Sequence, residues 1–169
     1  MLSRPPLLAL CAAALAVLGA CDSGDAVDTP TPADVAGVYD VADLRFVPNS
    51  PGLRTVILAD TLVAGDTSVR LFDGGQATLE FRREGGVARF VPGEFEVRRR
   101  QLRLTFDGGN GEALARLLLP QELTFDRDDD SGALSLQEPL TANLEAYDAA
   151  RYGGFRSVPG TLTFRLNAR

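Results

Sequence analysis

Three aspartates at alternate positions give this sequence its most metal-like pattern. Asp126, Asp128 and Asp130 follow one another in DRDDDSGALSLQ at the spacing that calcium-binding loops use for their first carboxylates. The pattern then departs from such a loop, because Gly132 falls one place late and the twelfth position is Gln137 instead of glutamate. The flanking runs ELTF and ALSL are typical of strands. We therefore predict an acidic hairpin tip and assign no metal, with weak calcium binding by the tip as the alternative.

The residue types that usually carry catalysis are nearly missing. The chain has no His and no Lys, and its two cysteines are Cys11 and Cys21. The lack of histidine excludes Ser–His and Cys–His catalysis, and zinc, copper and haem sites would lose their usual ligands. A pair of carboxylates across a cleft remains, but a chain with 23 acidic residues always contains such a pair on paper. We expect no enzyme activity and no cofactor.

The charge balance is acidic and uses arginine as its only cation. The chain has 17 basic and 23 acidic residues, for a formal net charge of -6. Nucleic acid is not an expected partner, because phosphates need a basic face. The run RRR at 98–100 is expected at a hairpin tip, where charge discourages pairing of strand edges. Contact of this run with lipid headgroups or an acidic partner is the alternative.

The N-terminal segment is typical of an export signal. Arg4 is followed by an apolar run, Leu7–Ala20, that is shorter than the roughly 20 residues of a membrane-spanning helix. A short basic region, a compact apolar region and small residues before a cleavage point describe a secretory signal peptide. We assign residues 1–20 to such a peptide.

The end of this segment is more specific than an ordinary cleavage site. Leu18-Gly19-Ala20-Cys21 resembles the bacterial lipobox, in which an apolar residue and two small residues precede a cysteine. The resemblance implies that Cys21 is lipidated on sulfur, becomes the first residue after cleavage and anchors the protein in a membrane. Several acyl chains make a firm anchor, since each buried methylene contributes about 0.8 kcal/mol. The alternative is a plain signal peptide with an incidental cysteine.

Residues 21–34 form a predicted tether behind the lipid. They are rich in Asp, Pro, Gly and Ser and have too little apolar surface to order themselves. Asp22, directly after the cysteine, resembles an inner-membrane retention signal of enterobacterial lipoproteins. The aspartates at 22, 25 and 28 together resemble the surface-export signal of Bacteroidota-type lipoproteins. We expect the cell envelope, at the periplasmic or surface face of the outer membrane rather than at the inner membrane.

A single domain is predicted over 35–169. Apolar and polar side chains alternate through it with a period of two, which is typical of strands with one buried face. Short strands at about 10-residue spacing favour an antiparallel sandwich or barrel. The strand-like runs are 36–47, 53–63, 67–72, 76–83, 86–92, 94–98, 102–106, 122–126, 133–137, 140–147 and 159–168.

Turns and helices interrupt this pattern at a few places. Apolar residues fall at odd-numbered positions over 95–97 and at even-numbered positions over 102–106. Because side chains alternate strictly along one strand, this switch predicts a hairpin turn at Arg98–Gln101. Glycine-containing segments such as PG at 92–93 predict further turns. Residues 111–119 fit either a helix, capped by Asn110, or a buried strand. The segment DAARYGG at 148–154 is predicted to form one helical turn.

The first and last strands carry a second resemblance. In GVYDVADLRF, Gly37 and Tyr39 have the spacing of the Gly-x-Trp pair that opens lipocalin-type barrels, with Tyr in place of Trp. In those barrels an Arg on the last strand packs near the aromatic residue, and Arg165 fits that place. The resemblance implies an all-β, antiparallel up-and-down barrel of about 8–10 strands with one or two short helices. The alternative for Tyr39 is an ordinary core aromatic.

These observations leave three functional hypotheses. The preferred one is a lipid-anchored monomer whose barrel binds a small apolar ligand in an interior cavity. Its candidate contacts are Tyr39, Tyr147, Tyr152 and Phe155, although the last three could instead pack a loop over the barrel end. The alternative is a structural or assembly lipoprotein with a filled barrel that binds an envelope protein. An enzyme would require a carboxylate pair with perturbed pKa values in a cleft.

Overall fold

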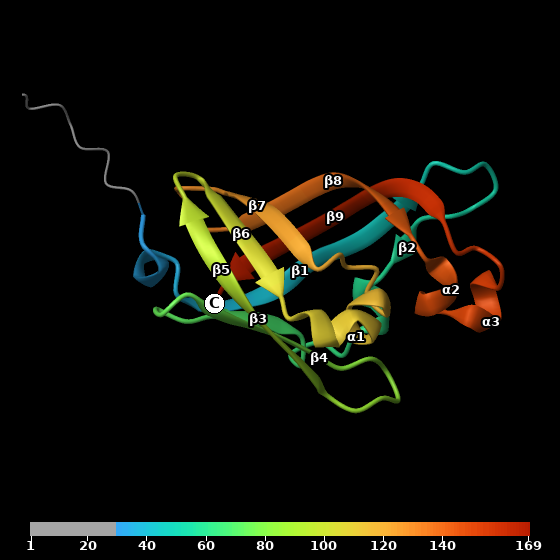
Figure 1. Ribbon diagram of the computed structural model, residues 1–169, viewed down its shortest axis with the longest axis horizontal. Coiled ribbons are helices and arrows are strands. Elements are labelled where there is room, and N and C mark those ends of the chain that lie inside the picture. The colour runs from blue at the N-terminus through green and yellow to red at the C-terminus, as the bar shows by residue number, and fades with distance from the viewer. Residues whose placement is uncertain (1–29) are drawn as a thin grey trace, which may run out of the picture.

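Eight antiparallel strands close into a barrel (Figure 1). The computed structural model describes residues 30–169. Each barrel strand pairs with its neighbour in the sequence, and the last strand pairs back onto the first, which confirms the predicted up-and-down barrel. A short strand, β2 (Val56–Ile57), pairs with one end of β1. The barrel strands are β1 (Gly37–Pro48), β3 (Ser68–Leu71), β4 (Gln76–Phe81), β5 (Arg89–Arg98), β6 (Gln101–Phe106), β7 (Glu122–Arg127), β8 (Leu134–Ala142) and β9 (Val158–Ala168).

Helical segments gather at one end of the barrel, as Figure 1 shows for α1 (Gly111–Ala115), α2 (Leu144–Tyr147) and α3 (Ala149–Tyr152). The 3-10 turn η3 (Gly108–Asn110) leads into α1, and η2 (Ala59–Thr61) follows β2. The hairpin turns of β3–β4, β5–β6 and β7–β8 lie at the opposite end, where η1 (Pro32–Asp34) leads into β1. No helix among the described residues is long and apolar enough to cross a membrane.

The inward side chains of all eight strands form one continuous apolar core. Period two places them at alternate positions, for example Leu162, Phe164 and Leu166 on β9, each 0% exposed. In β1 the inward side chains change from odd-numbered positions, such as Tyr39, to even-numbered positions, such as Leu44. The change occurs because the register with β9 shifts between Val41 and Asp43. This bulge adds one residue and turns the second half of β1 back toward the core.

Three predicted strand boundaries are wrong. Pro92 and Gly93 do not form a turn; they lie inside β5, and a Cβ on Gly93 would overlap the Thr105 carbonyl oxygen of β6. The glycine is therefore used for close approach of two strands instead of for a bend. The run 53–63 contains only β2 and η2, and the two runs at 133–147 are one strand, β8, followed by α2.

Two short helices lie in the segments where the sequence predicted helical turns. Residues 111–115 are α1, and 149–152 are α3, as the helical interpretations predicted. Asn110 precedes α1, but its side chain does not cap the helix; it donates to the Asp107 carbonyl oxygen at 3.4 Å. The predicted hairpin between β5 and β6 is confirmed, since Arg98 pairs directly with Gln101.

Arg99 in this hairpin has a φ of 54°, in the left-handed region that favours glycine. We expect Arg99→Gly to raise the free energy of unfolding by about 1 kcal/mol, because the strain of a side chain there is about 1–2 kcal/mol. Urea denaturation measures the change. Arg100→Gly is the matched control, since Arg100 has no positive φ, and it is expected to give no gain. Equal effects of the two variants would contradict the assignment of strain to Arg99.

Candidate functional site: an opening in the barrel wall

Tyr39 lies inside the barrel and is 5% exposed. Its hydroxyl donates a 2.8 Å hydrogen bond to the Val35 carbonyl oxygen, which ties the segment after η1 to the barrel. Burial raises the pKa of the phenol. Arg165 does not pack near it: Arg165 is exposed on the outer face, and the β9 residue opposite Tyr39 is Ala168. Tyr39 is therefore part of the core.

The other aromatic candidates lie at the helical end of the barrel. Tyr147 and Tyr152 are buried, with ring centroids 6.3 Å apart. The guanidinium of Arg83 lies 4.7 Å from the Tyr147 ring centroid, and its Nη1 donates to the Tyr147 carbonyl oxygen at 3.0 Å. Phe155 lies outside this pair and is 44% exposed. The two tyrosines thus hold α2 and α3 over the barrel end.

The three aspartates of the acidic hairpin do not converge on one point. Asp128 Oδ1 accepts hydrogen bonds from the N–H and hydroxyl of Ser131 and from the backbone N–H of Asp130. These bonds, those from Ser131 above all, lower the pKa of the Asp128 carboxyl. Asp126 accepts from Gln101 Nε2 of β6 at 3.2 Å. No metal-type group of three acidic, His or Cys side chains occurs among residues 30–169. Asp128 therefore stabilises the β7–β8 turn.

Cys21 and the lipobox at 18–21 lie outside the described residues. The tether of 21–34 is described only from residue 30 onward, where Thr31 and Asp34 form a reciprocal capping box around η1. The domain assignment at 35–169 and the lipid anchor remain predictions.

Five phenylalanines fill the barrel interior. Each is 0–1% exposed, which leaves no room for a water-sized sphere against its ring. Phe125 and Phe164 meet edge to face, with centroids 5.4 Å apart. Around these rings there is no interior cavity of the kind that the ligand hypothesis requires. The five are Phe46, Phe81, Phe106, Phe125 and Phe164.

The wall of this filled barrel is interrupted between β7 and β8. These strands pair only next to their hairpin, at Asp126–Ser135 and Arg127–Leu134, and then diverge (Figure 1). In contrast, β8 pairs with β9 along its whole length. We call the region bounded by residues 122–125 of β7 and 136–142 of β8 the wall opening.

Backbone groups of both strands face the wall opening. On β7, Gln121 and Arg127 make backbone hydrogen bonds to β6, so the alternate residues Glu122 and Thr124 direct their N–H and C=O groups toward β8. On β8, the Ala133 carbonyl oxygen accepts from Asp128, so residues 137, 139 and 141 direct theirs toward β7. None of these residues has a partner in the register between the two strands.

Pro139 helps to end the ladder of hydrogen bonds between β7 and β8. It lies on the side of β8 that faces β7, where it has no N–H to donate. A proline therefore leaves a hydrogen bond unmade on the side that its nitrogen faces. The sequence thus leaves β8 with an edge toward β7 although β8 lies within a closed ring.

Glu138 and Leu140 continue the inward face of β8 after Leu134 and Leu136. Leu134 and Leu136 are buried, whereas Glu138 and Leu140 are half-buried. A hollow of about 250 Å³ adjoins Leu140, and its other apolar walls include Leu118, Leu119, Pro120 and Ala142. The site therefore combines free strand edges, an apolar hollow and one inward carboxylate.

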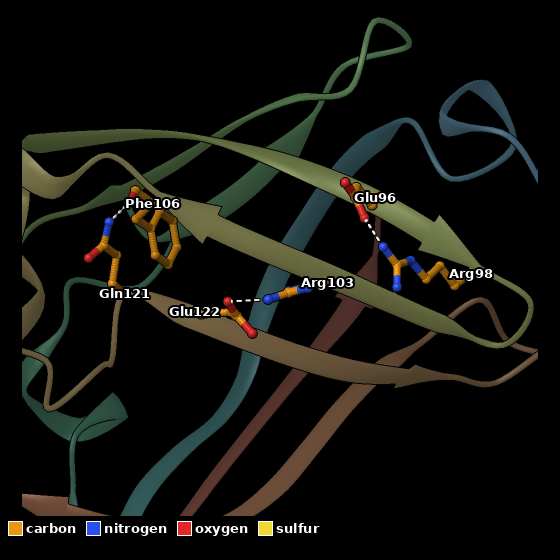
Figure 2. A network of polar contacts seen from close by, with 6 residues as sticks. All are labelled: Glu96, Arg98, Arg103, Phe106, Gln121 and Glu122. Atoms are coloured by element: carbon orange, nitrogen blue, oxygen red, sulfur yellow. Dashed lines mark hydrogen bonds and ion pairs between the residues drawn. The ribbon is translucent and has the colours of Figure 1, made fainter.

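The outer rim of the wall opening is held to β6 (Figure 2). Arg103 Nη2 of β6 donates to Glu122 Oε2 of β7 at 2.6 Å, and Gln121 Nε2 donates to the Phe106 carbonyl oxygen at 3.0 Å. No side-chain hydrogen bond of the described chain joins residues 122–125 to residues 136–142. β7 is thus fixed to β6 and leaves its other edge free.

Glu138 has an environment that opposes its charge. Burial, and then the charge of Glu122, raise the pKa of the Glu138 carboxyl. A carboxyl whose pKa is higher in the folded than in the unfolded state destabilises the fold above the folded-state pKa, and this penalty disappears as the pH falls below the unfolded-state pKa. Glu138 was not among the predicted site residues, although a period of two carried from Leu134 through Pro139 places it on the inner face.

We expect Glu138→Gln to raise the melting temperature at pH 7, because the amide removes the penalty of the charge. At pH 3, where carboxyl groups are mostly protonated, the difference between the two proteins is expected to vanish. Thermal unfolding followed by circular dichroism at both pH values measures it. A melting temperature that falls at pH 7 would show that the carboxylate is favourable in the fold.

A second hollow, of about 280 Å³, lies beside the β1 bulge. Its apolar walls include Val41, Leu62 and Val63, and Asp40 and Arg169 stand at its rim. These two side chains form an ion pair of 2.7 Å, which lowers the pKa of Asp40 and raises that of Arg169. A larger hollow of about 450 Å³ lies on the outer wall of β4–β6, and polar and apolar groups line it about equally.

Comparisons with known proteins give a fold likeness without a family. No family model and no curated protein matches the chain. An uncharacterized protein from Bacteroides eggerthii aligns with 80% of this chain and 100% of its own, at 14% identity and a TM-score of 0.39. Apocrustacyanin C1 aligns at 14% identity and a TM-score of 0.40, and apocrustacyanin C2 at 13% and 0.38. Each of these two alignments covers 83% of this chain and 63% of the other.

Proposed function

We propose that this protein is a lipid-anchored lipoprotein of the bacterial cell envelope whose filled barrel binds a protein partner. The observation that carries the partner-binding role is the interior: five phenylalanine rings, each 0–1% exposed, occupy the space that a ligand-binding barrel keeps free. Recognition must then take place on the outside or at the wall opening. No enzymatic activity is part of this proposal.

The sequence supports the anchor. A basic residue, a short apolar run and Leu18-Gly19-Ala20-Cys21 agree with a lipoprotein signal, and an acidic segment follows. The described chain enters the barrel at the end that carries the hairpins, so a lipid on Cys21 would hold that end nearer the membrane. We place the protein at the outer membrane, on its periplasmic or surface face.

A small apolar ligand is the second candidate function. It is favoured by the hollow beside the β1 bulge, where Val41, Leu62 and Val63 offer an apolar surface of limited size. Ligand pockets usually hold about 300–1,000 Å³, so this hollow lies at the lower limit. The ligand would occupy the outer wall and not the barrel interior.

Metabolic labelling tests the anchor. The full chain, expressed in a bacterial host with radioactive palmitate, is expected to take up label and to sediment with membranes. Cys21→Ala is expected to lose both properties, whereas Cys11→Ala is expected to keep them. Label that persists in Cys21→Ala would overturn the assignment of the lipid to this cysteine.

Native mass spectrometry of the detergent-purified full chain separates the two candidate functions. The partner-binding role predicts the mass of the lipidated protein and nothing more. A stoichiometric additional mass that organic extraction removes, and that Leu62→Arg abolishes, would favour the small ligand in the hollow beside β1.

A further inference from the structure

The wall opening has the features of a strand-binding site. We propose, on the basis of the partner-binding role above, that it takes up an extended segment of the partner protein as an additional strand, with a lysine or arginine of that segment against Glu138. Backbone hydrogen bonds would supply affinity, and the side-chain positions along the strand would supply specificity.

The backbone edges of β7 and β8 suit an extended peptide. Glu122 and Thr124 face the opening with N–H and C=O groups that have no β8 partner in the register. On the opposite edge, Gln137 and Thr141 offer the same groups, and Pro139 offers its carbonyl oxygen. An extended peptide carries backbone N–H and C=O groups at the same spacing as the unpaired groups of a strand edge. A helix or a compact ligand does not present donors and acceptors at that spacing.

Charge decides the kind of side chain that the segment carries. Glu138 lies on the inner face of β8, half-buried, and no side-chain hydrogen bond to it occurs among the described residues. Glu122 at the rim adds a second negative charge, although Arg103 partly balances it. A cationic side chain would pair with Glu138 and relieve the cost of that charge. The hollow of about 250 Å³ beside Leu140 suits an apolar side chain of the same segment.

The charge of the protein's own N-terminal segment argues against self-occupation. The sequence DSGDAVDT at 22–29 has three aspartates and no basic residue. Placed in the wall opening, it would bring like charges toward Glu138 and Glu122. The occupant is therefore assigned to another protein.

Phage-displayed random dodecapeptides, panned against the detergent-purified full chain, test this proposal. Peptides that bind are expected to alternate apolar and polar residues and to contain Lys or Arg. Measured by fluorescence anisotropy, Glu138→Gln should weaken their binding roughly tenfold, because a charge-assisted hydrogen bond is lost. Glu94→Gln, a change of the same kind on the outer face of β5, should leave affinity within about twofold.

A backbone variant tests the binding mode independently of charge. Thr124→Pro removes an N–H that faces the opening and leaves the hydrogen bonds between β6 and β7 in place. It is expected to weaken peptide binding by roughly tenfold or more. Bound peptide should also slow hydrogen exchange at Gln137 and Thr141. Enriched peptides that bind wild type, Glu138→Gln and Thr124→Pro equally would overturn the proposal, as would a failure to enrich any peptide.

Photo-crosslinking in cells separates failure of this inference from failure of the proposed function. A photoreactive amino acid is placed at Thr141 in the opening or at Arg70 on the outer face of β3, a strand that pairs with neither β7 nor β8. A protein adduct from Thr141 that Glu138→Gln abolishes would support strand uptake. An adduct from Arg70 alone would overturn the wall opening as the site and leave a partner-binding role standing. Adducts from neither position would count against both.

Discussion

Phe164→Ala is expected to lower the free energy of unfolding by about 3–5 kcal/mol, the usual cost of removing a buried phenylalanine ring. Phe164 is 0% exposed and meets Phe125 edge to face at 5.4 Å, so its loss leaves a cavity in the middle of the barrel. Urea denaturation followed by circular dichroism measures the change. We expect the variant to bind benzene or xenon, as engineered apolar cavities do.

The control for this experiment is Phe155→Ala. Phe155 is 44% exposed, and its removal is expected to change stability by about 0.5 kcal/mol or less. A loss of less than about 1 kcal/mol for Phe164→Ala would mean that neighbouring side chains collapse into the space. Benzene binding by the wild-type interior would show that the barrel is not filled.

Gly160→Val is expected to destabilise the protein by about 3 kcal/mol or more, through overpacking. Gly160 is an inward position of β9, and a Cβ there would overlap the Phe46 ring and the Val47 carbonyl oxygen of β1. Neither the ring nor the backbone has free space to move into, because Phe46 is 0% exposed. Thermal and urea denaturation of the purified variant measure the effect.

Gly111→Ala is the matched control. Gly111 is the first residue of α1, with a φ of −53°, and a Cβ there would contact nothing within 4 Å. This substitution is expected to be neutral or to stabilise the protein by about 0.4–1 kcal/mol, since it restricts the unfolded chain. If both glycine variants lost stability equally, the close approach of β9 to β1 would not be the cause.

The alternation of side chains predicted the barrel because it is a local property. Leu162, Phe164 and Leu166 alternate with polar residues whatever their partner strands are, and the opposite parities at 95–97 and 102–106 placed the turn correctly. The prediction of turns failed where a residue type occurs both in turns and inside strands. Pro92 and Gly93 suit a turn, but here the missing Cβ admits the backbone of β6.

The wall opening was not predicted because it depends on pairing between strands and not on one strand alone. A break was predicted inside β8, which concealed that Glu138 continues the inward face after Leu136. Pro139 was the available indication, since a proline has no N–H to donate toward the neighbouring strand. Tyr147 and Tyr152 do not form one site with Phe155, and this too could not be predicted from a single segment. The packing of the loop is set by contacts between residues far apart in the sequence, such as that of Arg83 with Tyr147.

Closure of the ring by its first and last strands has a consequence for the order of folding. Residues 39–48 pair with 160–168, so the contact that completes the barrel spans nearly the whole described sequence. Topologies with such distant contacts fold slowly, because the loop must close before the contact stabilises it. A chain that is translocated from its N-terminus would therefore expose β1 as an unpaired edge until β9 has crossed, and would need protection from aggregation during that interval.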